Sequence, residues 1–317
     1  MDFEDIIREK VGILVKHIDN YYKTGQPFNL GRGFMALTGD VIMQYLFSIT
    51  YDHLNSKDFE TTFHESFMAA SISGHLSLQF PIVPKILFSL PQPLLKKIEP
   101  LFALIFQLQK DLRQQIVALL ESIKSETTSN GTTEKPKVPT VFREIINDPE
   151  LPPSEKELRR LQDEAQLVVA GGISTVGWSL SVGSFHTISN PSIYKRLRQE
   201  LTTAFPDPNQ PLHWADLEKL PYLTGCIKES VRLSYPVAGR NPRLLPKPVV
   251  YKDFVIPART PISMTLVDII DDEEIFPDHT RFNPDRWIDP PKLKNGVSLE
   301  SYFVFFQKGT RSCLGIK

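Results

Sequence analysis

The strongest constraint on this chain lies in a ten-residue segment near its end, which reads Phe-Gln-Lys-Gly-Thr-Arg-Ser-Cys-Leu-Gly. Five of its residues stand at distinctive offsets: Phe306, Gly309, Arg311, Cys313 and Gly315. Glycines on both sides of a cysteine permit tight turns and a close approach of the backbone to the sulfur. The pattern predicts a loop built around a cysteine ligand, with a buried structural cysteine beside a turn as the plainer alternative.

Each position has a physical role if the Cys313 thiolate ligates a haem iron. A thiolate opposite bound oxygen pushes electron density through the iron and favours cleavage of the O–O bond. Backbone N–H groups turned toward the sulfur, which Gly309 and Gly315 allow, tune such a ligand. Phe306 can shield the metal side, and Arg311 can pair with a haem propionate.

Composition excludes several other classes of function. The chain has 317 residues, of which 41% are hydrophobic, so it can bury one large core or two ordinary ones. Its formal net charge of −1 offers no basic field, and we expect no nucleic-acid partner. Cys226 and Cys313 suggest no disulfide framework and favour a reducing, intracellular compartment.

The sequence also bears on membrane attachment. We find no apolar run that approaches the roughly 18 residues needed to cross a bilayer. The acidic, amphipathic start is unlike a secretory or mitochondrial leader. We therefore expect no transmembrane segment or anchor in the chain.

The first half of the chain reads as helices. Apolar residues recur every three or four positions over residues 3–22, and a largely apolar stretch covers residues 35–49. Further helices are expected over residues 58–78 and 94–124, on either side of a proline-punctuated turn. Residues 127–139, rich in Thr, Ser and Lys, predict an exposed loop.

The second half opens with the best-defined helix. Ser154 and Glu157 match a capping box, in which each side chain accepts a backbone N–H at the start of a helix. The sequence then changes from charged to apolar, and this predicts a helix that enters the core. Gly171 and Gly172, adjacent in mid-helix, each cost about 1 kcal/mol relative to alanine. Something must approach the helix there, and tight helix packing is the plainer explanation.

Further elements follow toward the cysteine loop. The dipeptide Asn190-Pro191 predicts the start of a helix that continues to about Ala204. A later helix carries Glu229 and Arg232 on one face, which by itself is typical of a solvated surface pair. Short strands are expected over residues 237–243, 249–251, 254–256 and 261–264.

The order of these features resembles the cytochrome P450 family. From Ser154 to Lys317 the glycine-containing helix, the Glu-x-x-Arg helix, a Pro-x-Arg segment and the cysteine loop follow in the family's order. The first half resembles the family only in its helical character. Two segments, Arg232-Leu-Ser-Tyr and residues 302–309, most resemble fungal P450s of the trichodiene-oxygenase type, which oxidise terpenoids and other secondary metabolites.

The resemblance implies a mainly α fold with a small β region. It implies one partial P450 domain over residues 1–317, with a helical lid and substrate-channel part at 1–150 and a haem-binding core part at 151–317. Relatives carry an N-terminal anchor, a first sheet and early helices before this match, and a helix and strands after the cysteine loop. We therefore expect a chain that is incomplete at both ends, whose intact relatives are anchored in the endoplasmic reticulum. For residues 58–124 an ordinary helix pair remains the alternative to a lid.

The resemblance also implies roles on the central helix. Gly171 and Gly172 would open a groove for oxygen, and Thr175 would take part in proton delivery. The family usually has Asp or Glu before this threonine, whereas this chain has Ser174. A serine can hold a water but supplies no proton at neutral pH.

Other implied roles surround the cysteine loop. Cys313 would be the axial ligand of the haem iron, and Arg311 and Arg243 would meet the propionates, with Arg240 as the alternative to Arg243. Glu229 and Arg232 would be buried and completed by Arg286. A carboxylate between two guanidiniums has both oxygens satisfied, so this network would be structural and would position the cysteine loop.

The function implied is a haem-dependent monooxygenase that oxidises an apolar small molecule in fungal secondary metabolism. It would use O2 and electrons from an NADPH-cytochrome P450 reductase. Two alternatives stay open. Ser174 motivates a haem-thiolate isomerase or dehydratase that needs no external protons, and the expected incompleteness motivates a catalytically silent remnant.

Overall fold

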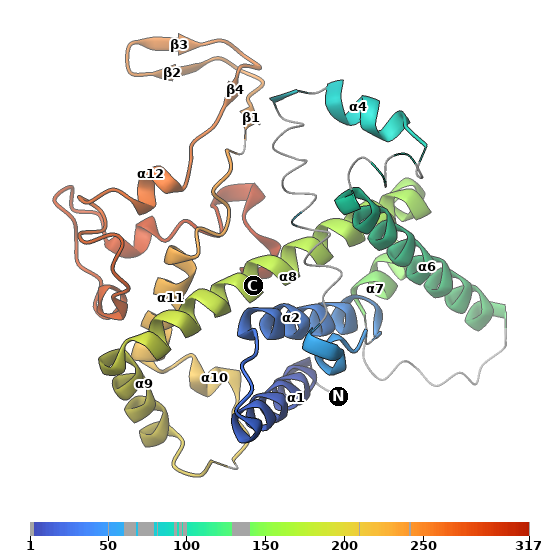
Figure 1. Ribbon diagram of the computed structural model, residues 1–317. Coiled ribbons are helices and arrows are strands. Elements are labelled where there is room, and N and C mark those ends of the chain that lie inside the picture. Colours follow the sequence, from blue (N-terminus) through green and yellow to red (C-terminus); the bar gives the residue numbers. More distant parts are fainter. Residues whose placement is uncertain are drawn as a thin grey trace. The chain divides into compact units, whose positions relative to one another are not determined.

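The computed structural model describes residues 3–49, 51–59, 68, 79–80, 82–91, 94, 97, 100–128, 140–208, 210–240 and 242–316 (Figure 1). The chain divides into two compact units, an N-terminal unit of Met1–Trp178 and a C-terminal unit of Ser179–Lys317.

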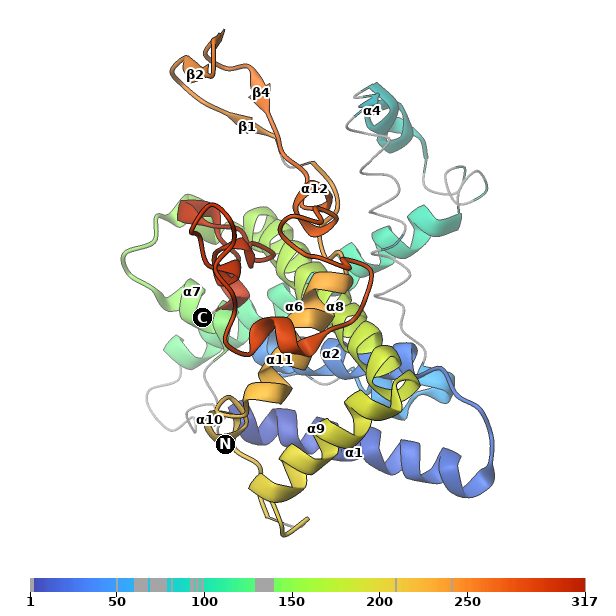
Figure 2. The ribbon, with the colours of Figure 1, turned by 90° about the vertical axis from the view of Figure 1, so that its left-hand side faces the viewer.

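The described part of the N-terminal unit is helical. Its longer helices are α1 (Phe3–Thr24), α2 (Leu30–Phe47), α4 (Ile82–Ser89), α6 (Pro100–Thr128), α7 (Val141–Asn147) and the first part of α8 (Leu158–Ser189). Short 3-10 turns are η1 (His53–Asn55), η2 (Lys57–Phe59) and η3 (Pro153–Lys156). Figures 1 and 2 show α1 alongside α2, and Asn29 caps α2 by accepting the backbone N–H of Arg32.

The core of the N-terminal unit forms where α8 packs among α2, α6 and α7. Leu161, Ala165, Val169 and Ile173 recur every four residues along α8, so they share one face, and each is at most 2% exposed. Their partners in this core include Met43, Leu46, Leu112, Ile116 and Phe142. Burial of each large apolar side chain contributes about 1.5–3 kcal/mol, and this holds α8 in place.

The C-terminal unit combines helices with two small antiparallel strand pairs. Its helices are α9 (Pro191–Ala204), α10 (Trp214–Leu217), α11 (Pro221–Leu233) and α12 (Val267–Ile270), followed by the 3-10 turns η4 (Pro284–Trp287), η5 (Leu299–Tyr302), η6 (Gly309–Arg311) and η7 (Leu314–Ile316). Strand β1 (Arg243–Leu244) pairs with β4 (Pro261–Ile262), and β2 (Val249–Tyr251) pairs with β3 (Phe254–Ile256).

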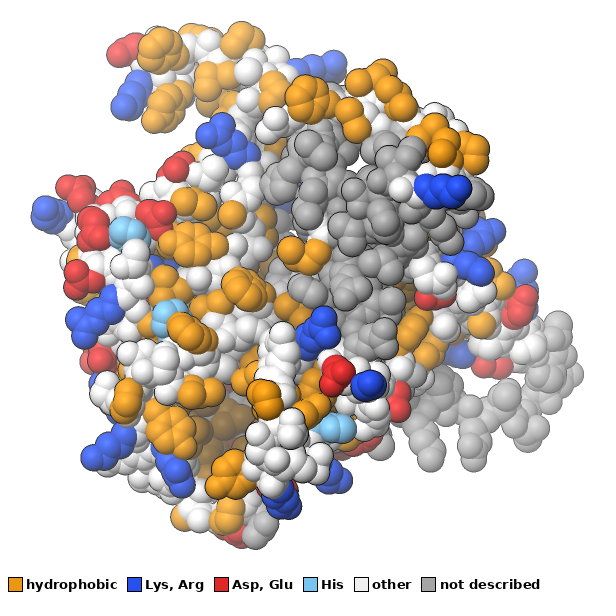
Figure 3. Space-filling view, in the orientation of Figure 1, with side chains coloured by type: hydrophobic (Ala, Val, Ile, Leu, Met, Phe, Trp, Pro, Cys, Tyr) orange, Lys and Arg blue, Asp and Glu red, His pale blue; other side chains and the backbone are white. Residues whose placement is uncertain are grey.

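The strand pairs leave much of their apolar surface exposed. Figures 1 and 2 show both pairs extending away from α11 and α12, and Figure 3 shows hydrophobic side chains gathered over the β2–β3 hairpin. Val250 and Val255 face each other across the hairpin and are 72% and 67% exposed. This region contributes little to the core of the C-terminal unit.

The prediction of a mainly helical fold with a small β region is confirmed. The helix expected from Asn190-Pro191 to Ala204 is α9, and the expected strands at 249–251 and 254–256 are β2 and β3. The helix expected over residues 58–78 lies almost entirely outside the described residues, as do residues 129–139 of the expected loop. Residues 127 and 128 belong to α6.

The capping-box prediction was wrong. Ser154 lies inside the 3-10 turn η3, which has no side-chain cap hydrogen bond. Glu157 has an extended backbone, with φ −63° and ψ 141°, so α8 begins one residue later at Leu158. Pro152 and Pro153 explain the difference, because prolines favour a short turn over a continuous helix here.

The expectation of no transmembrane segment stays a prediction, because one described helix has the composition of a membrane span. Among the described helices, α8 is long and apolar enough to cross a membrane by length and composition. Its Gly, Ser and Thr residues hide this from a search for an uninterrupted apolar run. Core helices of soluble proteins pass the same test, and four α8 side chains belong to the N-terminal core.

The division of the chain into these two units falls inside α8, between Trp178 and Ser179. The first part of α8 packs into the N-terminal core, as described above. Its later turns approach α11, where the Ser179 hydroxyl donates to the Ser234 hydroxyl at 3.0 Å. A Cβ on Gly183 would lie 2.3 Å from Ser230 Oγ. One continuous helix therefore supplies packing surface to both units.

Candidate haem-ligand loop and its supports

The cysteine loop is a sequence of tight turns in the C-terminal unit. The backbone N–H of Cys313 donates to the Phe306 carbonyl at 2.8 Å, and Ser312 N–H donates to the Gly309 carbonyl at 3.1 Å. Two residues lie in the left-handed region: Gly309, with φ +81°, and Gln307, with φ +59°. Glycine adopts this conformation without steric cost, which explains its place at 309.

The loop presents Cys313 as a free, exposed thiol. Gly315 follows it closely, since a Cβ on this glycine would lie 3.8 Å from the Cys313 sulfur. Leu314, between them, is 90% exposed, and Arg311 is exposed as well. An accessible thiol with a cation two residues away fits a thiolate-ligated haem, because the thiolate is the metal ligand and the guanidinium pairs with a carboxylate.

Aromatic rings connect this loop to the body of the C-terminal unit. The Phe306 ring lies 6.0 Å from that of Phe303, measured between centroids. Phe303 makes edge contacts with the buried Phe305 at 5.0 Å and with Trp287 at 5.2 Å. Such ring pairs contribute about 0.5–1.5 kcal/mol each beyond their buried area. They anchor the first residue of the loop.

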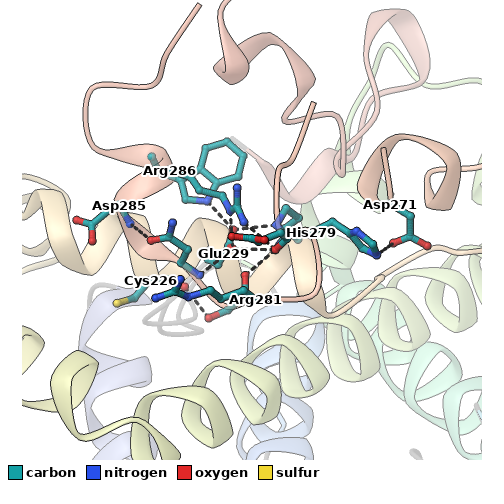
Figure 4. Close-up of polar contacts among 12 residues, drawn as sticks. Cys226, Glu229, Asp271, His279, Arg281, Asp285 and Arg286 are labelled. Atoms are coloured by element: carbon teal, nitrogen blue, oxygen red, sulfur yellow. Dashed lines mark hydrogen bonds and ion pairs between the residues drawn. The ribbon is translucent and has the colours of Figure 1, made fainter. Parts of the chain in front are cut away.

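Trp287 in turn belongs to a buried network around Glu229 (Figure 4). Glu229 and Arg232 on α11 have side chains that are 0% exposed, and they form a bidentate pair at 2.8 and 2.9 Å. Arg286 Nε reaches Glu229 Oε1 at 3.3 Å, and Trp287 Nε1 donates to Oε2 at 2.9 Å. The backbone N–H of Asn283 donates to Oε1 at 3.0 Å. Both carboxylate oxygens are thus fully engaged.

The same arginines tie down the loop between α12 and η4. Arg232 Nη2 donates to the Arg281 carbonyl at 3.2 Å, and Arg286 Nη2 donates to the Asp278 carbonyl at 2.9 Å. Burial lowers the pKa of Arg286, and the nearby Glu229 carboxylate opposes that shift. Because the guanidiniums bridge segments that are about 50 residues apart in sequence, the network fixes tertiary and not only local structure.

A second polar cluster extends the network to the end of α12. Tyr235 donates its hydroxyl to Asp271 at 2.5 Å, and His279 contacts Glu273 at 2.6 Å. His279 also lies 3.9 Å from Asp271, as Figure 4 shows. The hydrogen bond from His279 lowers the pKa of Glu273, and burial together with Asp271 raises the pKa of Tyr235 to about 12. These contacts fasten the end of α11 to the loop that carries Asp278.

Arg243 and Arg240 occupy different settings. Arg243 is on strand β1, and its Nη2 donates to the Gln307 side-chain oxygen at 2.9 Å. Arg240 is exposed and lies in the irregular segment before β1. Of these two arginines, Arg243 is the one that contacts the cysteine loop in the described part of the chain.

The two central glycines of α8 have different surroundings. Among the described residues, a Cβ on Gly171 would meet nothing within 4 Å, whereas one on Gly172 would lie 3.0 Å from two atoms of Ile42 on α2. Gly172 therefore serves close helix packing in the N-terminal unit. Thr175 lies one turn after Gly171 and donates its hydroxyl to the Gly171 carbonyl at 2.6 Å.

The side chains of Ser174 and Thr175 point in different directions from α8. Adjacent helical side chains point about 100° apart. Ser174 is 8% exposed, and its hydroxyl has no hydrogen-bond partner among the described residues. A buried hydroxyl left in this way is an unusual feature in a packed protein, where such groups are nearly always paired.

Sequence reasoning missed three participants in this region. Trp287 and Asn283 donate to Glu229, and Gln307 accepts from Arg243. The aromatic residue beside Arg286 was the available signal for Trp287, because a buried indole N–H needs an acceptor. Nothing in the sequence signals the other two, since a backbone donor and a half-buried glutamine carry no distinctive pattern.

Comparisons with known proteins show the family of the chain. The family model described as cytochrome P450 matches residues 1–317. Cytochrome P450 monooxygenase sdnE of Sordaria araneosa is 42% identical over 99% of this chain and 62% of its own length. Cytochrome P450 monooxygenase tpcC of Cochliobolus heterostrophus is 34% identical over 99% of this chain and 58% of its own length. Tryptophan 6-hydroxylase fscE of Fusarium equiseti is 33% identical over 99% of this chain and 60% of its own length.

The chain spans about 60% of the length of these relatives. Members of the matched family carry a thiolate-ligated haem and use O2, a small-molecule substrate and a redox partner. The match extends through the first half, where the sequence had offered only helical character. This chain belongs to the cytochrome P450 family.

Proposed function

We propose that this chain forms part of a haem-dependent monooxygenase that oxidises an apolar small molecule in fungal secondary metabolism. The observation that carries the proposal is the free, exposed Cys313 in its glycine-containing loop, within a chain matched throughout by the P450 family. Names of related fungal proteins support the reaction class, since sdnE and tpcC are monooxygenases. A thiolate-ligated haem supplies the activation of O2 when it is bound.

The residues of the cysteine loop would hold and tune this group. Cys313 supplies the thiolate, and the turns at Gly309 and Gly315 allow the backbone to pass close to the sulfur. Phe306 would shield the metal side. Arg311 and Arg243 would supply positive charge as partners for the haem carboxylates.

On α8, Thr175 would handle the proton. Its hydroxyl is an O–H donor that points back to the Gly171 carbonyl at 2.6 Å, so its orientation is fixed in advance. Gly171, with nothing where a side chain would stand, leaves this surface of the helix open. Ser174 holds a hydroxyl where the resemblance implies an acid, so the proton would come through water and not from a carboxyl at this position.

The Glu229 network would act on the site from a distance. It fixes Trp287, which contacts Phe303, and Phe303 contacts the first residue of the cysteine loop. We assign Glu229, Arg232 and Arg286 a positioning role for this reason. None of the three needs to touch a reacting atom.

Electrons would come from an NADPH-cytochrome P450 reductase, and the protein would work in a reducing intracellular compartment. The second point follows from the cysteines, both of which are unpaired thiols. Cys226 is buried, and burial raises its pKa to about 12, so it stays a neutral thiol under physiological conditions.

Dependence on O2 tests the proposed reaction. The chain, loaded with haem and mixed with reductase, NADPH and a panel of apolar terpenoids, is expected to give products that gain one oxygen atom from labelled O2. Product formed without O2 and reductase would instead identify a haem-thiolate isomerase or dehydratase. A purified chain that takes up no haem and forms no product would identify a silent remnant.

A further inference from the structure

The backbone of the cysteine loop contains an unexpected residue at position 307. Gln307 has φ +59°, in the left-handed region that glycine occupies without a steric penalty. The conformation is fixed locally, because the Gln307 N–H donates to the Val304 carbonyl at 2.9 Å. A glutamine held in this region is expected to contribute something through its side chain that glycine lacks.

That side chain makes a long-range contact. Gln307 Oε1 accepts from Arg243 Nη2 at 2.9 Å, across 64 residues of sequence. Arg243 itself is held on strand β1, where it pairs in register with Ile262 of β4. The hydrogen bond therefore links the strand pair to the turn that opens the cysteine loop.

The chemistry of the acceptor matters as much as its position. A neutral amide oxygen orients a guanidinium without cancelling its charge, whereas a carboxylate would cancel it. A guanidinium has five N–H donors in a rigid fork, so one bond to an amide can orient the rest. Gln307 thus presents a charged, oriented Arg243 beside the loop that carries Cys313.

We infer that Gln307 is a positioning residue that fixes Arg243, and not Arg240, as the partner of a haem carboxylate. The inference rests on the proposed function, because it assumes that the loop holds a haem. It assigns the choice between the two arginines to a side chain to which the resemblance gave no role, and it explains why a left-handed position carries glutamine.

Transfer of haem from the loaded chain to excess apomyoglobin tests the inference. Gln307→Gly removes the amide and relieves the backbone, so haem release is expected to become several-fold faster while the thermal midpoint of the haem-free chain stays equal or rises. Arg243→Ala is expected to accelerate release to a similar extent, and the double variant no further, because the two residues act as a unit. Arg240→Ala is expected to leave the rate unchanged.

Two control variants separate positioning from simple loop stability. Asp289→Gly relieves a similar left-handed residue, with φ +51°, outside the cysteine loop, and is expected to leave haem release unchanged. Gln307→Glu keeps the size of the side chain and cancels the charge of Arg243, so the haem reduction potential is expected to fall.

The outcomes distinguish this inference from the proposed function. Suppose that the wild type binds stoichiometric haem. Unchanged haem release in Gln307→Gly would then overturn the inference and leave the function intact. A larger effect of Arg240→Ala than of Arg243→Ala on haem release would do the same. A wild-type chain that takes up no haem would overturn both.

Discussion

Replacement of Glu229 by glutamine should be among the most damaging single-atom changes in the C-terminal unit. The substitution keeps the size of the side chain but removes the charge that two guanidiniums and an indole N–H share. It also turns one acceptor oxygen into an NH2 group that faces donors. Breaking a buried ion pair from one side costs about 3–5 kcal/mol, because an uncompensated charge remains buried.

The size of the unit converts this energy into a temperature. For a cooperative unit of roughly 140 residues, 1 kcal/mol shifts the unfolding midpoint by about 3 °C. Glu229→Gln is therefore expected to lower the midpoint of the C-terminal unit by about 10–15 °C, measured by the fluorescence of its tryptophans, Trp214 and Trp287. Burial supports this figure, since Glu229 and Arg232 have no exposed side-chain surface.

A matched control is available on the surface of the same unit. Glu300 also pairs with a cation, Lys228, at 2.8 Å, but its side chain is 45% exposed. Exposed pairs contribute at most about 1 kcal/mol, so Glu300→Gln should shift the midpoint by less than about 3 °C. If Glu229→Gln behaves like Glu300→Gln, the Glu229 network does not stabilise the unit and the reasoning fails.

Two further predictions concern the glycines of α8 and the cysteines. Gly172→Ala should lower the free energy of unfolding by about 1–3 kcal/mol, because its Cβ would press on Ile42. Gly171→Ala should raise the free energy of unfolding by up to about 1 kcal/mol, because alanine favours a helix. Equal effects of the two substitutions in urea unfolding would contradict this reasoning. Iodoacetamide at pH 9 should label Cys313 alone in the folded haem-free chain, because Cys226 is buried and burial raises its pKa to about 12. Mass spectrometry should find a second label, on Cys226, only after unfolding.

Local sequence signals predicted the elements well wherever few residues decide the structure. Asn190-Pro191 starts α9 because proline at the first helical position fixes φ and gives up an N–H that the helix does not use. The Asn190 side chain nevertheless makes no cap hydrogen bond to α9 and donates to the His186 carbonyl at the end of α8. The type of element was predictable, and the partner of the side chain was not.

The capping box shows where local signals mislead. Ser154 and Glu157 have the required spacing, but the prolines before them set a 3-10 turn and leave Glu157 extended. A two-residue capping pattern forms only where the neighbouring residues allow the backbone conformation that it needs. Proline restricts the backbone more strongly than a side-chain hydrogen bond does.

The candidate site was predictable in its parts and not in its connections. Cys313 follows from the spacing of its loop, and the resemblance to the family pointed to Glu229, Arg232 and Arg286, which the structure brings together. The contact of Trp287 with Glu229 joins residues 58 positions apart, and no local pattern encodes such a distance. The pair of glycines at 171 and 172 reads as one feature in the sequence, yet only Gly172 is closed by a neighbour.

The absorption spectrum of the reduced, carbon-monoxide-treated chain tests the central claim most directly. If the Cys313 sulfur ligates a haem iron as thiolate, the wild type should show the strongly red-shifted Soret band of thiolate ligation, and Cys313→Ala should lose it while Cys226→Ala keeps it. A haem-loaded wild type without that band, or a band that survives in Cys313→Ala, would contradict the account.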